Sequence, residues 1–217
     1  MAEMMKGNEA IAEAAIRAGA RFYAGYPITP SSEIMEYLSW RMNEVGGAFV
    51  QAESELAGIN MVIGASSCGV RALTASSGPG ISLKQEGIST LCDEGLPAVV
   101  ITQVRYGNGL GTLFTSQCDY HRETRGGGQG DYRCIVLCPS SIQEFVDLML
   151  PAYELAEKYR IVTIMMGEGT LGQMMEPVEL PDFVEPKRTP WALNGHYTYK
   201  KIGIFERDSM AEAVELR

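Results

Sequence analysis

The stretch Ala98-Val99-Val100-Ile101-Thr102, written AVVIT, is strongly β-branched and shows no alternation between apolar and polar residues. A strand of this kind is covered on both faces, which is typical of a parallel sheet between two layers of helices. Five other short stretches also have the composition of strands: 22–26, 48–50, 71–75, 134–137 and 161–166. The sequence therefore predicts one sheet that contains the AVVIT strand.

Segments with apolar residues at helical spacing alternate with these strands. The helices expected between them cover residues 9–18, 32–42, 54–63, 83–91 and 141–159. Alternating strands and helices predict an α/β fold with a doubly wound, mostly parallel sheet. In such a sheet, ligands bind beyond the carboxyl ends of the strands. The loops expected to form a site are therefore 27–32, 51–55, 76–80 and 103–120.

The composition excludes several classes of function. Lys and Arg number 18 against 27 Asp and Glu, which gives a formal net charge of −9 over 217 residues. A protein that follows nucleic acid by charge needs a basic stripe, which this sequence lacks. The longest apolar runs are too short to cross a membrane, and the first residues lack the apolar stretch of a signal peptide. Five cysteines at scattered spacings suit a reducing compartment, so we expect a cytoplasmic protein.

Two motif matches fail when their surroundings are considered. Residues 167–172 match G-x-G-x-x-G, but Pro177 soon follows and leaves no room for the full helix of a dinucleotide site. Cys134 and Cys138 flank a strand and would lie roughly 13 Å apart, whereas thiolates that share a zinc ion must be within about 4 Å. No cysteine spacing fits an iron–sulfur cluster. We therefore expect neither a dinucleotide nor a metal site on this chain.

The loop expected after the first strand has the sequence GYPITPSSE and places Thr29 between Pro27 and Pro30. Proline on each side restricts the backbone to extended or turn geometry. The hydroxyl of Thr29 is then fixed beside a helix N-terminus, which favours anions. The alternative is a rigid turn that only begins a capped helix.

The next loop carries two acids, Glu53 and Glu55, in the first turn of a small and apolar helix. A carboxylate at the start of such a helix is a candidate for a functional hydrogen bond. The alternative is that both are ordinary helix-start acids, which the helix dipole favours.

Two further loops complete the candidate site. Ser76, Ser77 and Gly78 belong to the turn SSGPG, in which the backbone can approach a ligand closely. Arg105 follows the AVVIT strand and precedes a glycine-rich loop. An arginine at such a place is costly to bury unless it meets an anion, and its planar fork suits a carboxylate.

Six motifs occur in one order along residues 6–177: GNEAIAEAA, GYPITPSSE, ESELAGINMVIGAS, TASSGPG, VRYGNGLGT and GGGQGDYR. In this order they resemble the alpha subunit of the 2-oxoacid:ferredoxin oxidoreductases, and most of all the branched-chain type that acts on 2-oxoisovalerate. The combination is far more specific than any single motif. The sequence departs from that family in the loop at 106–109, where a glycine-glycine-proline form is expected after the arginine.

The resemblance implies an enzyme of EC class 1.2.7 that uses thiamine diphosphate and is active only with partner subunits. Residues 1–176 would be its pyrimidine-binding domain, and 177–217 a proline-rich linker to a second domain missing from this chain. Glu55 would hydrogen-bond the aminopyrimidine N1′ of the coenzyme, while Thr29 and Arg105 would hold the carboxylate and carbonyl oxygen of the 2-oxoacid. Residues 76–80 would form a loop near the coenzyme.

The same resemblance implies that the coenzyme is shared with a beta subunit, which would carry the Mg²⁺ and diphosphate site. An iron–sulfur subunit, ferredoxin and coenzyme A would be further partners, in a dimer of heteromers. Other enzymes of the coenzyme remain open: a 2-oxoglutarate or pyruvate type, a non-oxidative decarboxylase or a protein similar to acetohydroxyacid synthase. A scaffold subunit of the same fold that binds no coenzyme is a further alternative.

Overall fold

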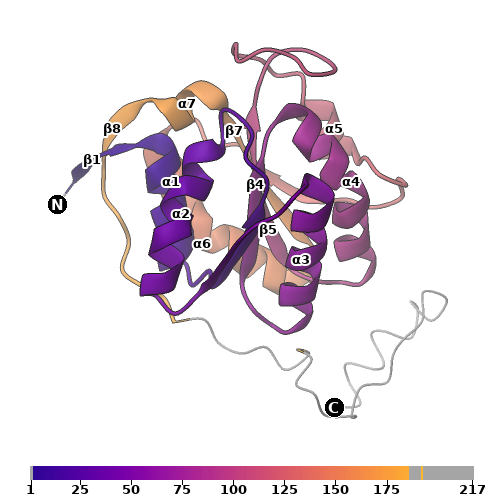
Figure 1. The fold of residues 1–217 in the computed structure, drawn as a ribbon, viewed down its shortest axis with the longest axis horizontal. Helices are drawn as coiled ribbons and strands as arrows, with labels where there is room; N and C mark the ends of the chain where they lie inside the picture. The colour runs from indigo at the N-terminus through magenta and orange to yellow at the C-terminus, as the bar shows by residue number, and fades with distance from the viewer. Residues whose placement is uncertain (1, 186–191, 193–217) are drawn as a thin grey trace.

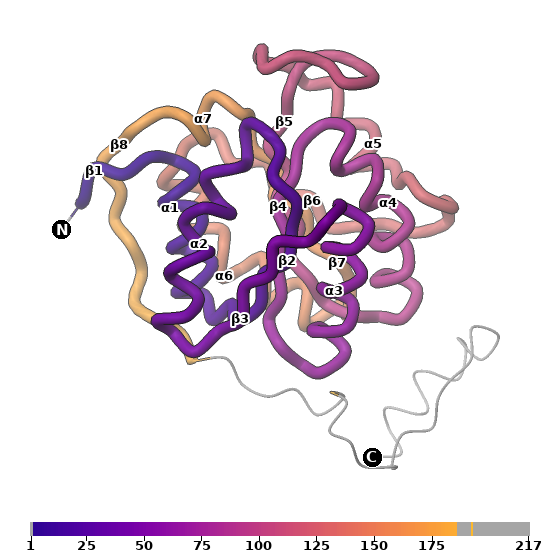
Figure 2. The backbone as a smooth tube through the Cα atoms, in the orientation of Figure 1, coloured from indigo at the N-terminus to yellow at the C-terminus, as the bar shows by residue number. Residues whose placement is uncertain are grey.

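Six parallel strands form the central sheet of the computed structural model, which describes residues 2–185 and 192. Their order across the sheet is β3-β2-β4-β5-β7-β6, and every neighbouring pair is parallel (Figures 1 and 2). The strands are β2 (Phe22–Gly25), β3 (Ala48–Gln51), β4 (Ala72–Ser76), β5 (Ala98–Val104), β6 (Ile135–Leu137) and β7 (Val162–Glu168). The predicted doubly wound α/β fold is confirmed.

Helices cover both faces of this sheet (Figure 1). One core cluster joins the sheet to α1 (Gly7–Arg17), α2 (Ser32–Glu44) and α6 (Ile142–Tyr159). The other joins it to α3 (Glu55–Ser67) and α4 (Gly78–Asp93). Strand β5 lies between the two layers: Val99 and Ile101 belong to the first cluster, and Ala98 and Val100 to the second. Because both faces are covered, the AVVIT stretch needs no polar residue on either side.

The start of α4 differs from the expected helix at 83–91. The helix begins at Gly78, so the serines and glycines of SSGPG are the end of β4, the N-cap and the first helical turn. Pro79 is suited to that first turn, because its missing N–H would have no partner there in any case. The coenzyme loop inferred from sequence is therefore a strand-to-helix junction rather than a free turn.

Short elements at the ends of the described chain were not predicted. Strands β1 (Glu3–Lys6) and β8 (Met175–Val178) form a separate antiparallel pair, and α7 (Gly169–Gln173) precedes β8. A further short helix, α5 (Tyr120–Arg125), lies in the long loop between β5 and β6. Such short segments carry too little periodicity to be recognised. The division at residue 176 stays a prediction, and the helix expected after Asp208 or Ser209 lies outside the described residues.

Candidate active site

The residues selected from sequence lie where the parallel strands end, at the side of the sheet formed by their carboxyl ends, here called the carboxyl edge. Strand β2 has β3 on one side and β4 on the other, so the chain leaves β2 and β4 at a topological switch point. Thr29 follows β2, Glu55 follows β3, Ser76 ends β4 and Arg105 follows β5. The fold thus brings residues from four loops to one edge.

Glu55 is the first residue of α3 and is almost fully buried, with an exposed fraction of 6%. Its place is set by Ser54, whose Oγ accepts a hydrogen bond from the Ala57 N–H at 3.2 Å and caps the helix. A Cβ atom added to Gly80 would lie 2.7 Å from Glu55 Oε1 and would also collide with Ser76 Oγ. The carboxylate, the serine hydroxyl and the first turn of α4 are therefore in close contact, and only glycine fits between them.

Arg105 joins two loops of the site rather than leaving its fork free. Its Nη1 donates to the Thr29 carbonyl oxygen at 2.9 Å, and its Nη2 donates to the Leu110 carbonyl oxygen at 2.6 Å. Its Nε is buried without a partner among the described residues and lies over Gly78, where a Cβ atom would come within 2.8 Å. Thr29 and Arg105 do meet, but through the threonine backbone, while the Thr29 residue is exposed.

The rigidity of the GYPITPSSE loop has a direct structural basis. Three successive carbonyl oxygens accept hydrogen bonds: that of Ile28 from the Ser31 N–H and Oγ, that of Thr29 from Arg105, and that of Pro30 from Asn8 Nδ2 at 2.7 Å. Because the backbone is held at each of these residues, the Thr29 side chain has a fixed origin.

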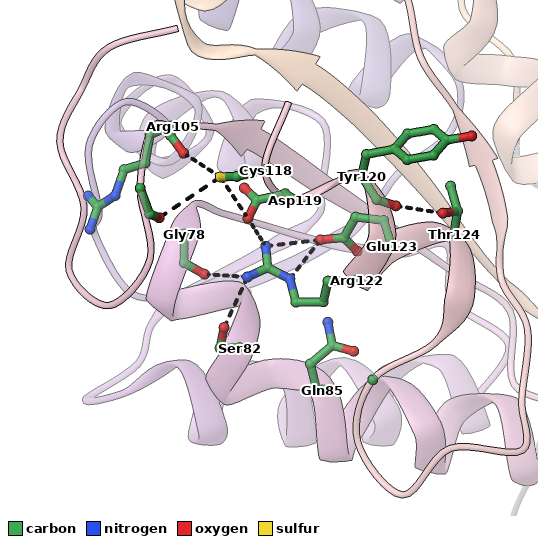
Figure 3. Close-up of polar contacts among 12 residues, drawn as sticks. Gly78, Ser82, Gln85, Arg105, Cys118, Asp119, Tyr120, Arg122, Glu123 and Thr124 are labelled. Carbon is green, nitrogen blue, oxygen red and sulfur yellow. Dashed lines mark hydrogen bonds and ion pairs between the residues drawn. The ribbon is translucent and has the colours of Figure 1, made fainter. Parts of the chain in front are cut away.

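Arg122 of α5 fastens the start of α4 (Figure 3). Its Nη1 donates to the Gly78 carbonyl oxygen at 3.0 Å and to Ser82 Oγ at 2.9 Å, and its guanidinium pairs with Asp119 and Glu123. Burial raises the pKa of Glu123 to about 7, although Arg122 opposes the rise. Sequence reasoning gave this short helix no role, because its contacts with α4 join residues about 40 positions apart.

Lys84 is a second residue that sequence reasoning missed. It lies on α4 with an exposed fraction of 0%, and its Nζ donates to the Glu55 backbone oxygen at 3.4 Å. A signal was present: Lys84 occupies the helical face that Ile81 and Ile88 share, where an apolar residue is expected.

Residues 2–185 and 192 offer neither a metal centre nor a membrane-spanning helix. No group of three or more His, Cys, Asp or Glu side chains is placed to hold a metal ion. No helix in that part of the chain is long and apolar enough to cross a membrane. The sulfur atoms of Cys92 and Cys134 lie 3.8 Å apart.

Comparisons with known proteins agree with this geometry. A ketoisovalerate oxidoreductase subunit VorB of Methanothermobacter marburgensis is 51% identical over 195 residues, covering 89% of this chain and 55% of that protein. A 2-oxoglutarate synthase subunit KorA of Methanocaldococcus jannaschii is 46% identical over 184 residues, which are 84% of this chain and 50% of the KorA subunit. A solved 2-oxoglutarate:ferredoxin oxidoreductase of Magnetococcus marinus, with 2-oxoglutarate, coenzyme A and succinyl-CoA bound, matches with a TM-score of 0.83 and 32% identity. The match covers 91% of this chain and 35% of the solved oxidoreductase chain.

The fold is that of the pyrimidine-binding domain of the thiamine diphosphate enzymes. The family described as pyruvate flavodoxin/ferredoxin oxidoreductase, thiamine diphosphate-binding, matches residues 13–207, and the chain belongs to that family. The family resemblance inferred from the six motifs is confirmed. The chain spans about half the length of the curated relatives it matches.

Proposed function

We propose that the protein is a subunit of a thiamine diphosphate-dependent 2-oxoacid:ferredoxin oxidoreductase. The whole enzyme would convert a branched-chain 2-oxoacid to an acyl-CoA and pass electrons to ferredoxin. The observation that carries the proposal is the buried Glu55 carboxylate at the start of α3, in a chain of this family. Residues 1–176 would be the pyrimidine-binding domain, 177–217 the linker, and the cytoplasm the compartment.

The residues at the carboxyl edge suit the coenzyme. Ser76 Oγ and Ser77 Oγ are buried and have no hydrogen-bond partner among the described residues, so each can still donate to a ligand. Gly80 has no side chain, so the first turn of α4 packs directly against the Glu55 carboxylate. Glu55, with Ser76, Ser77 and the Gly78 backbone, would therefore hold the aminopyrimidine. Thiamine diphosphate, when bound, supplies the electron sink for a carbanion formed as carbon dioxide leaves.

The protein's own residues have separable tasks in this proposal. The Glu55 carboxylate would share a proton with the ring nitrogen that it faces, as a general acid–base group. The Thr29 hydroxyl and the Nε–H of Arg105, which has no partner among the described residues, would orient the 2-oxoacid carboxylate. Arg122 would keep the first turn of α4 in place beneath the ligand.

The 2-oxoacid is proposed from the relatives' names. The ketoisovalerate relative has the higher identity, 51% against 46% for the 2-oxoglutarate relative, so a branched-chain substrate is favoured. Steady-state rates of the complete enzyme with 2-oxoisovalerate, 2-oxoglutarate and pyruvate test this choice. The highest kcat/KM with 2-oxoisovalerate is expected, and equal or higher values with 2-oxoglutarate would reassign the substrate.

Partner subunits are proposed from the relatives' naming as subunits and from one exposed loop. Residues 106–118 follow β5, contain no charged residue and stand out above the carboxyl edge (Figure 1). Four large apolar side chains of this loop are 55–78% exposed: Tyr106, Leu110, Leu113 and Phe114. Soluble proteins rarely leave such a cluster uncovered, so this loop suits a beta subunit that brings the Mg²⁺ and diphosphate site to Glu55. Iron–sulfur clusters would lie on a further subunit, in a dimer of heteromers.

Phe114→Asp should weaken binding of the beta subunit by about tenfold or more, because a charge would be buried in the apolar contact. Tyr159→Asp is the matched control, since Tyr159 is also exposed but ends α6 at the opposite edge of the sheet. Affinity is measured by calorimetry between purified subunits. An unchanged affinity for Phe114→Asp would remove the loop from the interface.

The chain alone should bind thiamine diphosphate weakly or not at all. The diphosphate of such enzymes is held through Mg²⁺, and the sequence lacks the Gly-Asp-Gly signature that would bind the ion. Calorimetry with coenzyme and Mg²⁺ should give no tight binding until the beta subunit is added. Tight, magnesium-dependent binding to this chain by itself would contradict the shared site.

A further inference from the structure

Lys84 is buried more completely than its chemistry favours. It lies in the middle of α4 and has an exposed fraction of 0%. Lysine is almost never fully buried unless it is paired with a group of opposite charge. Among the described residues, however, no carboxylate oxygen lies within 4.0 Å of its Nζ.

The Lys84 amine is directed at the start of α3. Its hydrogen bond to the Glu55 backbone oxygen is 3.4 Å long, beyond the usual 2.7–3.2 Å. Burial lowers the pKa of Lys84 to about 8, and the charge of Glu55 works against this lowering. The Lys84 ammonium group thus lies at the backbone of Glu55 and interacts with the Glu55 charge, although no direct ion pair joins the two side chains.

In the part of the chain that the structure describes, Glu55 is the charged group that acts on the Lys84 pKa. Asp119 and Glu123 lie beside the start of α4 but pair with Arg122. Cys92 and Asp93 lie two turns further along α4. Within α3, Glu55 is the only titratable residue, and β5 has none. Strand β7 has Glu168 at its carboxyl end, and Glu86 of α4 itself is exposed. The loop at 126–130, which contacts α4 at Gln85 and Ser89, carries no charge.

We propose that Lys84 is a positioning residue of the active site: its buried ammonium group balances the charge of the Glu55 carboxylate and keeps that carboxylate directed toward Ser76 and Gly80. This inference rests on the proposed function, in which Glu55 faces the coenzyme. Lys84 acts through Glu55 and needs no contact with coenzyme or substrate. As pH rises through about 8 the amine loses its proton, so its contribution is present below that pH and lost above it.

The coupling between Lys84 and Glu55 is tested first in the absence of coenzyme. The Lys84 ¹³Cε resonance of the full chain, assigned by its loss in Lys84→Met, is followed against pH in wild type and in Glu55→Gln. Because coupling is reciprocal, removal of the Glu55 charge should weaken proton binding at Lys84 by about tenfold, moving its titration to lower pH. An identical titration in both proteins would overturn the proposal.

The role in the site is tested in the complete enzyme by exchange of the coenzyme's thiazolium C2 proton. In wild type, exchange should fall above pH 8. In Lys84→Met it should be at least tenfold slower at pH 7 and lack this alkaline decline. In a Glu55→Gln background, Lys84→Met should not slow exchange further. If Lys84 were only structural, its loss would slow exchange both in wild type and in Glu55→Gln. Lys158→Met, at an exposed position of α6, is the matched control and should match wild type.

The outcomes separate this proposal from the proposed function. Wild-type exchange with an intact alkaline decline in Lys84→Met would reject Lys84 and leave the oxidoreductase assignment standing. A wild-type complex without thiamine diphosphate would reject the assignment, and the coenzyme-free titration would still decide on the pair. If Lys84→Met fails to assemble, the coenzyme-free titration of wild type and Glu55→Gln still tests the proposal. The Lys84 resonance is then assigned by selective labelling of the wild-type chain.

Discussion

Glu55→Gln should lower turnover of the assembled enzyme by about 10²–10⁴-fold, the range of general acid–base effects. The amide has nearly the shape of the carboxylate, so packing against Gly80 and the cap by Ser54 should survive. What is lost is the ability to share a proton with the ring nitrogen. The defect should therefore appear in kcat and in C2 proton exchange.

Glu53→Gln is the matched control for this prediction. Glu53 lies two residues before Glu55, carries the same group and is exposed, so its loss should leave exchange almost unchanged. Exchange is measured by quenched-flow deuterium incorporation into the bound coenzyme. Wild-type exchange in Glu55→Gln would remove Glu55 from the chemistry, and a crippled Glu53→Gln would move the role to that residue.

The fold was predictable because its signals are local. AVVIT needs no polar alternation when helices cover both faces, and each helix carries its own apolar periodicity. The start of α4 was misjudged because glycines and a proline are typical of turns. Glycine is needed at position 80 because Glu55 and Ser76 leave no room for a side chain against the first turn of α4. That contact joins residues distant in sequence, so no local pattern contains it.

The place of the candidate residues in the fold was predictable from sequence, but their contacts were not. Position after a strand was enough to select Thr29, Glu55 and Arg105, because all parallel strands end at the same edge. Sequence could not show that Arg105 already donates to two carbonyl oxygens, nor that Lys84 reaches Glu55 from the middle of a helix. Both facts depend on how loops and helices pack around the edge.

The two carbonyl contacts of Arg105 change what its substitution should do. Arg105 is 7% exposed and holds the loop after β2 to the loop after β5, with Nε left without a partner among the described residues. In this arrangement the guanidinium positions the Thr29 loop, and Nε is one of the N–H donors that the two carbonyl oxygens do not use. Its role in binding the 2-oxoacid carboxylate therefore remains a proposal that the substitution must separate from loop holding.

Arg105→Met should raise the KM for the 2-oxoacid by about 10²-fold or more, the loss expected when a buried charge pair worth about 2–5 kcal/mol is broken. Arg105→Lys keeps the charge but cannot reach both carbonyl oxygens. Its KM should lie between those of wild type and Arg105→Met if the charge binds the substrate, and should equal that of Arg105→Met if Arg105 only holds the loops. Thr29→Val should lower kcat/KM by less, a loss near the ~1–3 kcal/mol of one unsatisfied hydrogen bond. Arg133→Met is the control, because Arg133 also donates to backbone carbonyl oxygens but is exposed. Coenzyme content should hardly change in any of them, and wild-type kinetics in both Arg105→Met and Thr29→Val would make these residues structural.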